Sequence, residues 1–233
     1  MASLKLHCSH HKHSWVLWFD ISLFIGTMFL VRNIYFSQFN FIANGLFWSF
    51  STLIVAMLLM KLRGITWRDI GLRKTESFKK SLLATIFIFV FTVISILTFQ
   101  ILKDSLGLNV SPDHSHQQAS SKFGDLSGNW GLFIMIIPFI WLQSMLEELL
   151  DRGFLINWFE KALSSTWFAT ATAVLLQALI FGFRHSYDLS ERSITVGLIG
   201  IAMGVGYACF GRNLWPLIVA HCMLNTMSML DRV

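Results

Sequence analysis

Long apolar segments divide this chain of 233 residues and constrain its fold more than any other feature. They span roughly 15–36, 41–61, 79–102, 131–160, 166–185, 194–210 and 213–230. A helix needs about 20 apolar residues to cross the hydrocarbon core of a bilayer, and most of these segments reach that length. The longest segment is able to tilt, or to contain a break that yields an eighth helix. We therefore expect an all-α fold, a polytopic transmembrane helical bundle of seven to eight helices forming a single integral-membrane domain over residues 1–233.

The composition agrees with a membrane protein. Hydrophobic residues make up 55% of the chain and charged residues only 13%, against about 25% charged residues in a soluble domain. The first apolar segment is too long for the apolar region of a signal peptide, so we expect it to remain as the first span. The net charge is +5, but Lys and Arg lie between apolar segments, as topology signals do. We expect the lipid bilayer as a partner, and no nucleic acid.

The distribution of basic residues predicts the orientation of the bundle. The strongest basic loop, residues 61–80, reads "KLRGITWRDIGLRKTESFKK". Loops rich in Lys and Arg stay on the cytoplasmic side of a membrane. We therefore expect this loop and the N-terminus in the cytoplasm, and the polar loop 103–130 on the opposite side.

The stretch "EELLDRG", residues 147–153, places four charged side chains between two apolar runs. Residues four apart on a helix share a face, so Glu148 and Arg152 are expected to form an ion pair that supports the structure. Glu147 points about 100° away and has Asp151 on its own face instead. A carboxylate held beside another acid in an apolar setting is a candidate general base. A purely structural ion-pair cluster is the alternative.

Two later motifs place polar residues inside apolar helices. "FGFRH" puts Phe181 and His185 four apart, and "HCMLN" does the same for His221 and Asn225. Taken alone, a packing histidine and an interhelical hydrogen bond would explain them. Counting along the helices puts Glu147 and His185 within about 9 Å in depth, with His221 shallower. We expect an intramembrane, water-filled cavity that collects all three motifs.

In this order, the three motifs resemble those of the CAAX protease and bacteriocin-processing family of intramembrane endopeptidases. The family is also called the type II CAAX prenyl endopeptidase or Abi family, and its pattern is EExxxR, FxxxH and HxxxN. The resemblance covers roughly residues 130–230, which would form the catalytic core, and more weakly the "WRDIGLRK" stretch of the basic loop. It implies that Glu147 activates a water and that His185 orients the water or shares its proton. His221 and Asn225 would hydrogen-bond the oxyanion of the tetrahedral intermediate.

The resemblance also assigns the remaining charged residues of the first motif. Glu148 and Arg152 would stabilise the site, which agrees with the division obtained from helix geometry. Asp151 departs from the family pattern, where this position is usually apolar or aromatic. An acid there either tunes Glu147 or marks a member with altered activity.

A metal ion is the main alternative to catalysis by Glu147 and the histidines alone, because this family has often been called metalloproteases. The chain has no HExxH motif, and its candidate residues form no evident three-ligand zinc site. We therefore expect no cofactor, with a divalent metal such as zinc on two His and a Glu as the less favoured alternative. His-rich stretches at 7–13 and 114–116 are expected to be a loose composition and a solvated loop.

These features predict an endopeptidase that hydrolyses a peptide bond of a membrane-associated peptide or a CaaX-type protein at the membrane. A short single-domain chain is typical of bacterial members, which indicates a bacterial cytoplasmic membrane and bacteriocin or pheromone precursors as substrates. One alternative is a non-proteolytic membrane scaffold or bacteriocin self-immunity protein with the same fold. A transporter that uses the buried carboxylates is disfavoured, because transporters often contain internal repeats and none is visible here.

Overall fold

The computed structural model of the protein describes residues 4–75, 77–111, 122–164 and 166–233, with side chains in the first helix from Ser14 onward. Within these ranges the regular elements are all helices. They are α1 (Leu4–Leu30), η1 (Val31–Asn33), α2 (Phe41–Leu62), α3 (Phe78–Ser105), α5 (Trp130–Glu147), η2 (Glu148–Ile156), α6 (Asn157–Ala162), α7 (Trp167–Ser186), α8 (Glu191–Cys209) and α9 (Leu214–Leu230). The predicted all-α fold is confirmed.

The predicted segment 131–160 is one continuous rod, and not a pair of helices. It runs over Trp130–Ala162, 33 residues, and consists of α5, η2 and α6 in succession. Its middle part, η2, is a π-helix, in which N–H groups bond five residues back and the turn is wider than in an α-helix. With this rod counted once, six described helices are long and apolar enough to cross a membrane, and α9 is a shorter apolar helix. Within the described residues the bundle therefore has seven helices, in the expected range, and the rod contains a widened turn instead of a break.

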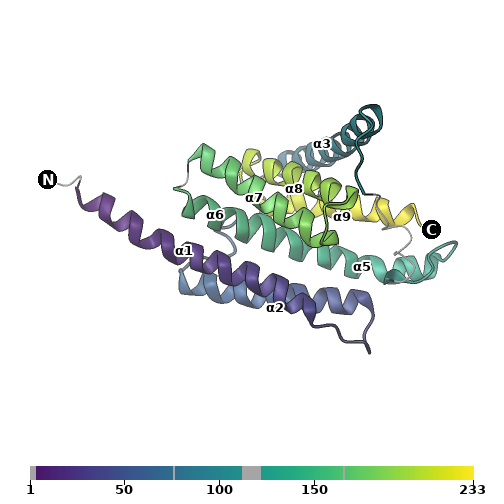
Figure 1. The fold of residues 1–233 in the computed structure, drawn as a ribbon, viewed down its shortest axis with the longest axis horizontal. Helices are drawn as coiled ribbons and strands as arrows, with labels where there is room; N and C mark the ends of the chain where they lie inside the picture. Colours follow the sequence, from purple (N-terminus) through teal and green to yellow (C-terminus); the bar gives the residue numbers. More distant parts are fainter. Residues whose placement is uncertain (1–3, 76, 112–121, 165) are drawn as a thin grey trace.

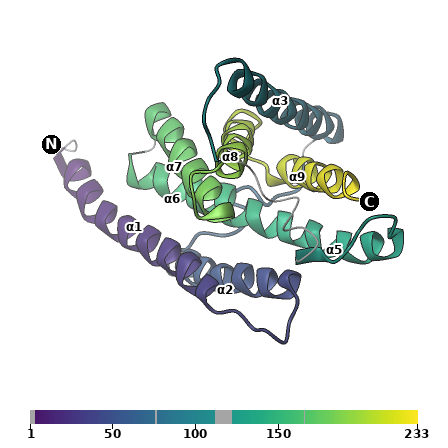
Figure 2. The ribbon, with the colours of Figure 1, turned by 45° about the vertical axis from the view of Figure 1, so that its right-hand side comes forward.

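The rod lies at the centre of the bundle (Figure 1). Helices α1 and α2 pack against each other on one side of it, and α7, α8 and α9 lie on the other side. Helix α3 is the outermost element and packs against α8 and α9, which the turned view also shows (Figure 2). This arrangement brings α5, η2, α7 and α9 together, and these are the elements that carry the three motifs.

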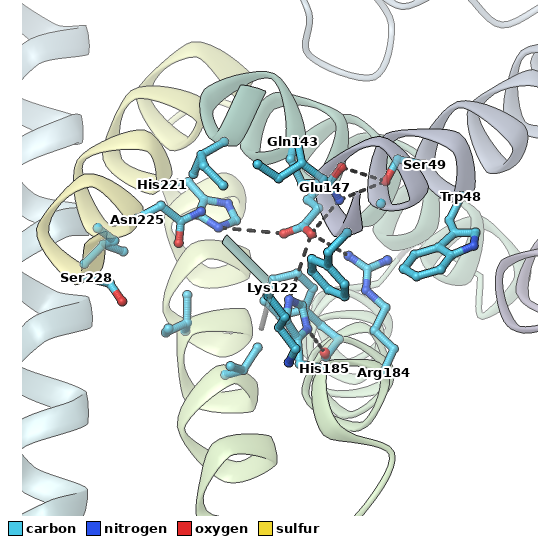
Figure 3. A pocket seen from close by; sticks show the side chains of 18 of the residues that line it. Trp48, Ser49, Lys122, Gln143, Glu147, Arg184, His185, His221, Asn225 and Ser228 are labelled. Atoms are coloured by element: carbon cyan, nitrogen blue, oxygen red, sulfur yellow. Dashed lines mark hydrogen bonds and ion pairs between the residues drawn. The ribbon is translucent and has the colours of Figure 1, made fainter. Parts of the chain in front are cut away.

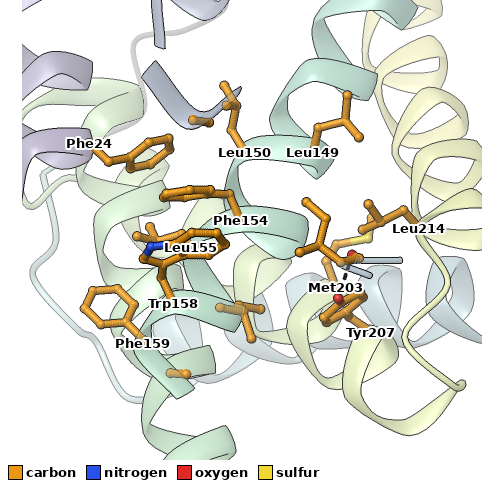
Figure 4. Close-up of a cluster of buried hydrophobic side chains, with 14 of the residues drawn as sticks. Phe24, Leu149, Leu150, Phe154, Leu155, Trp158, Phe159, Met203, Tyr207 and Leu214 are labelled. Atoms are coloured by element: carbon orange, nitrogen blue, oxygen red, sulfur yellow. Dashed lines mark hydrogen bonds between the residues drawn. The ribbon is translucent and has the colours of Figure 1, made fainter. Parts of the chain in front are cut away.

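Every residue of η2 is buried, and its apolar side chains form the centre of the hydrophobic core (Figure 4). The ring of Phe154 stacks on Phe24 of α1 at a centroid distance of 4.5 Å and on Trp158 of α6 at 4.0 Å. Offset stacking adds to the large apolar area that aromatic side chains bury. The charged residues of η2 are consequently held on a backbone that is packed on all sides.

The basic loop, residues 61–80, is hydrogen-bonded to α8 and to the start of α9. Leu214 donates its backbone N–H to the carbonyl of Gly71 at 3.0 Å, and the hydroxyl of Tyr207 donates to the carbonyl of Ile70 at 2.8 Å. Gly71 has a φ of +105°, and a Cβ at this position would collide with the carbonyl oxygen of Arg212. Only glycine meets both demands, so "RDIGL" forms a specific contact with the turn before α9.

Helices α7 and α8 pack closely because glycines line their contact. A Cβ on Gly182 would collide with the backbone carbonyl of Ser193. On the facing helix, Gly200 approaches Ala178, and Gly204 approaches Val174. Small residues let helix backbones approach in this way inside membranes. The packing fixes the depth and rotation of α7, which carries His185.

Candidate active site

A cavity of about 460 Å³ lies inside the bundle, and all four side chains predicted to be catalytic line it. They are Glu147, His185, His221 and Asn225. Glu147 comes from the end of α5, His185 from the end of α7, and the other two from α9. Figure 3 shows that these side chains converge from different helices on one space. The structure thus brings together the residues that the three motifs singled out.

The carboxylate of Glu147 lies between the two histidines. Its Oε1 is 3.9 Å from His185 Nε2, and its Oε2 is 3.8 Å from His221 Nε2. The side chain of Glu147 is 12% exposed. These separations are too long for direct hydrogen bonds, but they suit a water molecule that bridges the groups. Residue counting predicted that His221 would lie at a shallower depth than Glu147 and His185. In the structure His221 is as close to the Glu147 carboxylate as His185 is.

The ring of His185 is oriented by its own helix. His185 Nδ1 lies 2.6 Å from the carbonyl oxygen of Phe181, one turn earlier. A carbonyl oxygen accepts only, so Nδ1 carries a hydrogen. In a neutral ring, Nε2 is then a hydrogen-bond acceptor, and it faces Glu147. The FxxxH spacing therefore fixes the histidine tautomer as well as its position.

Glu148 connects the first motif to the third. Its Oε1 accepts a hydrogen bond from Arg152 Nη1 at 3.0 Å and lies 2.7 Å from His221 Nδ1. The side chains of Glu148 and Arg152 are completely buried. The expected ion pair is present, and the same carboxylate also fixes His221 with Nδ1 as the donor. Glu148 thus orients a candidate catalytic group in addition to its partnership with Arg152.

Asp151 is paired with a residue that sequence reasoning did not assign. Arg184 Nη2 donates to Asp151 Oδ2 at 2.7 Å, and the same nitrogen lies 3.9 Å from Glu147 Oε1. Asp151 therefore does not act on Glu147 as an unpaired acid, because a guanidinium offsets its charge. An arginine next to the motif histidine, inside an apolar helix, was the available signal in the sequence.

Phe181 is the common neighbour of the buried charges. The guanidinium carbon of Arg152 lies 4.3 Å from the centroid of its ring, and that of Arg184 lies 5.0 Å away. The ring of His185 meets it edge to face at 4.6 Å. A cation over an aromatic face is stabilised by the ring quadrupole, most strongly where water is excluded. This explains why an aromatic residue stands at the first position of FxxxH.

Asn225 joins α9 to α5 beside the cavity. Its Nδ2 donates to Ser144 Oγ at 2.8 Å, and the side chain lies near His221 on the same helix (Figure 3). A primary amide has two N–H donors, so this bond leaves one for another acceptor.

Residues 129–227 match the family described as type II CAAX prenyl endopeptidase Rce1-like. The match covers 99 of the 233 residues, so it shows the likeness of this segment to that family. No curated protein and no solved structure matches the chain. The match supports the resemblance to CAAX-type endopeptidases at the level of the family. The matched segment contains all three motifs and nearly coincides with the expected catalytic core.

The candidate active site includes a residue outside the three motifs. Gln143 Nε2 donates to Glu147 Oε1 at 3.0 Å and lies 2.9 Å from Ser49 Oγ of α2. Gln143 stands one helical turn before Glu147 in an otherwise apolar run, which was a usable signal. This glutamine ties the candidate base to the N-terminal pair of helices.

Two features of the site bear on whether it could hold a metal ion. Among the described side chains, no group of three His, Cys, Asp or Glu is arranged to hold one. Arg184 keeps a positive charge 3.9 Å from Glu147, and that charge opposes a second cation there. The His-rich stretches at 7–13 and 114–116 lie outside the part of the chain whose side chains the structure describes.

Proposed function

We propose that the protein is an intramembrane endopeptidase that hydrolyses a peptide bond of a membrane-associated peptide or CaaX-type protein through a water activated by Glu147. The observation that carries the proposal is the position of the Glu147 carboxylate, 3.9 Å from His185 Nε2 and 3.8 Å from His221 Nε2 in a cavity. A general base must reach its proton directly or through one water, and this geometry provides for a water.

The first chemical step is attack by this water. One hydrogen of the water points to Glu147 and the other to His185 Nε2, so a lone pair of its oxygen is directed at the substrate. Glu147 takes a proton while the C–O bond forms and the carbonyl π electrons move to the carbonyl oxygen. Glu147 then returns the proton to the amide nitrogen as the C–N bond breaks. The products are a carboxylic acid and an amine.

The oxyanion is stabilised by His221 and Asn225. His221 Nδ1 already donates to Glu148, so Nε2 donates only when the ring carries two protons. The buried carboxylate of Glu148 stabilises that imidazolium. Asn225 supplies the amide hydrogen that Ser144 does not use. Preorganised donors of this kind are usually a large part of catalysis in acyl transfer.

We propose that this chemistry proceeds without a metal. Glu147 and His185 supply the acid–base groups that an activated water requires. Purified protein is expected to retain cleavage after dialysis against a strong chelator, with less than about 0.1 equivalent of metal by elemental analysis. Activity that is lost on chelation and restored by zinc would refute this part of the proposal.

The cavity lies toward one end of the bundle, which bears on the substrate. Its described lining residues include members of η1, the start of α2, the end of α7 and the end of α9, and none from 61–80, 161–166 or 210–213. If the basic loop 61–80 is cytoplasmic, the cavity opens on the opposite face of the membrane. Of the candidate substrates, that orientation favours bacteriocin or pheromone precursors at a bacterial cytoplasmic membrane over a cytosolic prenylated protein.

The orientation is tested by cysteine labelling in intact cells, in a variant without the native cysteines. An impermeant maleimide should label a cysteine introduced at Ser127 and not one introduced at Lys74. Both positions are exposed and lie at opposite ends of the bundle. The reverse pattern would place the cavity opening in the cytoplasm and favour a CaaX-type substrate.

The decisive test of the function is proteolysis by the purified protein in lipid nanodiscs. Glu147→Ala and His185→Ala should each lower the rate by about 100-fold or more, the usual contribution of a general acid–base group. Asp104→Asn, which changes a carboxylate that is 75% exposed, serves as the control. Unchanged cleavage by both variants would exclude the mechanism and favour a non-proteolytic scaffold.

A further inference from the structure

Arg32 occupies an unusual position in the cavity wall. It lies in η1 at the end of the first span, with its guanidinium carbon 4.4 Å from the ring centroid of Trp48 and 5.1 Å from that of Tyr187. Aromatic contacts engage the face of the guanidinium and leave its N–H donors on the edge. Among the described residues, no hydrogen bond or ion pair engages those donors. The guanidinium of Arg32 is therefore held in place by two aromatic rings, and its N–H groups are able to donate to a ligand.

Both aromatic partners of Arg32 are fixed by the backbone. Trp48 is buried, and its Nε1 donates to the carbonyl of Ile34 at 2.8 Å. Tyr187 ends α7 in the left-handed region, with a φ of 59°, and its N–H donates to the carbonyl of Phe183 at 2.7 Å. Non-glycine residues rarely adopt this region, and backbone strain of this kind gathers at functional sites. Because Tyr187 follows His185 by two residues, one helix end positions both the histidine and the aromatic support of Arg32.

The charged side chains that line the cavity are mainly basic. Among its described lining residues, Glu147 is the only carboxylate. The basic side chains that line it are Arg32, Lys122, Arg184, Arg192 and Arg232. A cleft lined mainly by one sign of charge attracts ligands of the opposite sign. The planar fork of a guanidinium binds a carboxylate through two parallel hydrogen bonds.

We propose that Arg32 is the subsite for the free C-terminal carboxylate of a short peptide whose scissile bond lies at Glu147. This inference rests on the proposed function and deepens it, because it assigns a specificity-determining residue that none of the three motifs contains. A peptide is favoured as the occupant because Arg32 shares a cavity of about 460 Å³ with the candidate base. Arg32 and Trp48 lie outside the segment 129–227 that matches the family, whereas Tyr187 lies inside it.

The test compares two forms of one probe, a dansylated apolar pentapeptide made as the free acid and as the C-terminal amide. Equilibrium binding is measured in phosphatidylcholine nanodiscs with full-length wild type and Glu147→Gln, so that no cleavage is needed. The acid should bind about tenfold more tightly than the amide, the value of a charge-assisted pair. Arg32→Gln should reduce the ratio to about one, and Arg32→Lys should keep part of it. Lys74→Gln, outside the cavity, should leave the ratio unchanged.

The outcomes separate this inference from the proposed function. A preference for the acid that depends on Arg32, in a protein that cleaves nothing, would support the subsite and refute the peptidase. An equal or absent affinity for acid and amide in wild type, or a preference that survives in Arg32→Gln, would overturn the subsite. A lipid phosphate is the other possible ligand, and it is tested by measuring how much phosphatidylglycerol co-purifies with wild type and with Arg32→Gln. If Arg32→Gln retains less phosphatidylglycerol but keeps the wild-type ratio of acid to amide affinity, the guanidinium binds a lipid phosphate and the inference is wrong. A thermal unfolding curve like that of wild type shows that each variant is folded.

Discussion

Arg184 donates a 2.7 Å hydrogen bond to the buried carboxylate of Asp151, across 33 residues of sequence. This contact accounts for the acid that departs from the family pattern. A nearly buried arginine needs a counter-charge, and Asp151 of η2 provides one behind the cavity lining. Because Arg184 also lies 3.9 Å from Glu147, Asp151 fixes a cation beside the candidate base. Asp151 is thus part of an intact charge network, which supports tuning of the site rather than loss of activity.

The Asp151–Arg184 pair predicts a specific pattern of coupling. Asp151→Leu or Arg184→Met alone leaves one buried charge without its partner and should cost about 3 kcal/mol of unfolding free energy or more. The double variant removes both charges and should recover most of that loss. Chemical denaturation of the four proteins in detergent measures the coupling. Additive losses in the double variant would show that the two residues act independently.

Substitution of the two adjacent glutamates of the first motif is expected to affect stability very differently. Glu147→Gln changes a side chain that faces the cavity and should leave unfolding free energy within about 1 kcal/mol of wild type, with cleavage abolished. Glu148→Gln leaves Arg152 buried without its counter-charge and loosens His221, so it should destabilise by about 3 kcal/mol or more. Thermal unfolding and cleavage are measured on both variants. Equal stability of the two would contradict the division between a reactive and a supporting carboxylate.

Gln143 is expected to position Glu147. Gln143→Leu removes a hydrogen bond to a charged group and should lower kcat about tenfold with little change in KM. Gln177→Leu is the matched control, since Gln177 is a buried glutamine of α7 whose amide atoms have no hydrogen-bond partner among the described residues. That control should keep full activity. A change in KM alone in Gln143→Leu would assign Gln143 to substrate binding instead.

The helices and the composition of the site were predictable because they follow from local periodicity. Apolar runs gave most helix ends to within a few residues, although α1 begins at Leu4 and not near residue 15, because its polar start carries no apolar signal. The i, i+4 spacing gave the Glu148–Arg152 pair. Counting residues along two helices joined by a short turn placed Glu147 and His185 at similar depths. These are properties of single helices or of helices joined by short turns.

Contacts between distant helices were not predictable from the same signals. Hydropathy treats α5 and η2 as one uniform helix, while the wider turn of the π-helix changes where the later side chains point. The partner of Asp151 comes from α7 and that of Gln143 from α2, so both depend on helix packing. Residue counting placed His221 too shallow, because side-chain length and helix tilt compensate for several ångströms. The proposed role of Arg32 depends on the left-handed backbone conformation of Tyr187, which the sequence pattern does not predict.

The contact between α7 and α8 predicts the effect of one added methyl group. In Gly182→Ala the new Cβ would collide with the backbone carbonyl of Ser193, and backbone atoms do not move aside as a flexible side chain does. The two helices must separate, which should cost about 1–3 kcal/mol and displace His185, one turn further along α7. Gly26→Ala is the control, because no atom lies within 4 Å of its added Cβ and alanine favours a helix over glycine. Thermal unfolding should therefore shift down for Gly182→Ala and stay level or rise for Gly26→Ala, with cleavage reduced in the first variant alone. A Gly182→Ala protein with wild-type stability and activity would show that α7 can move away from α8 without disturbing the site.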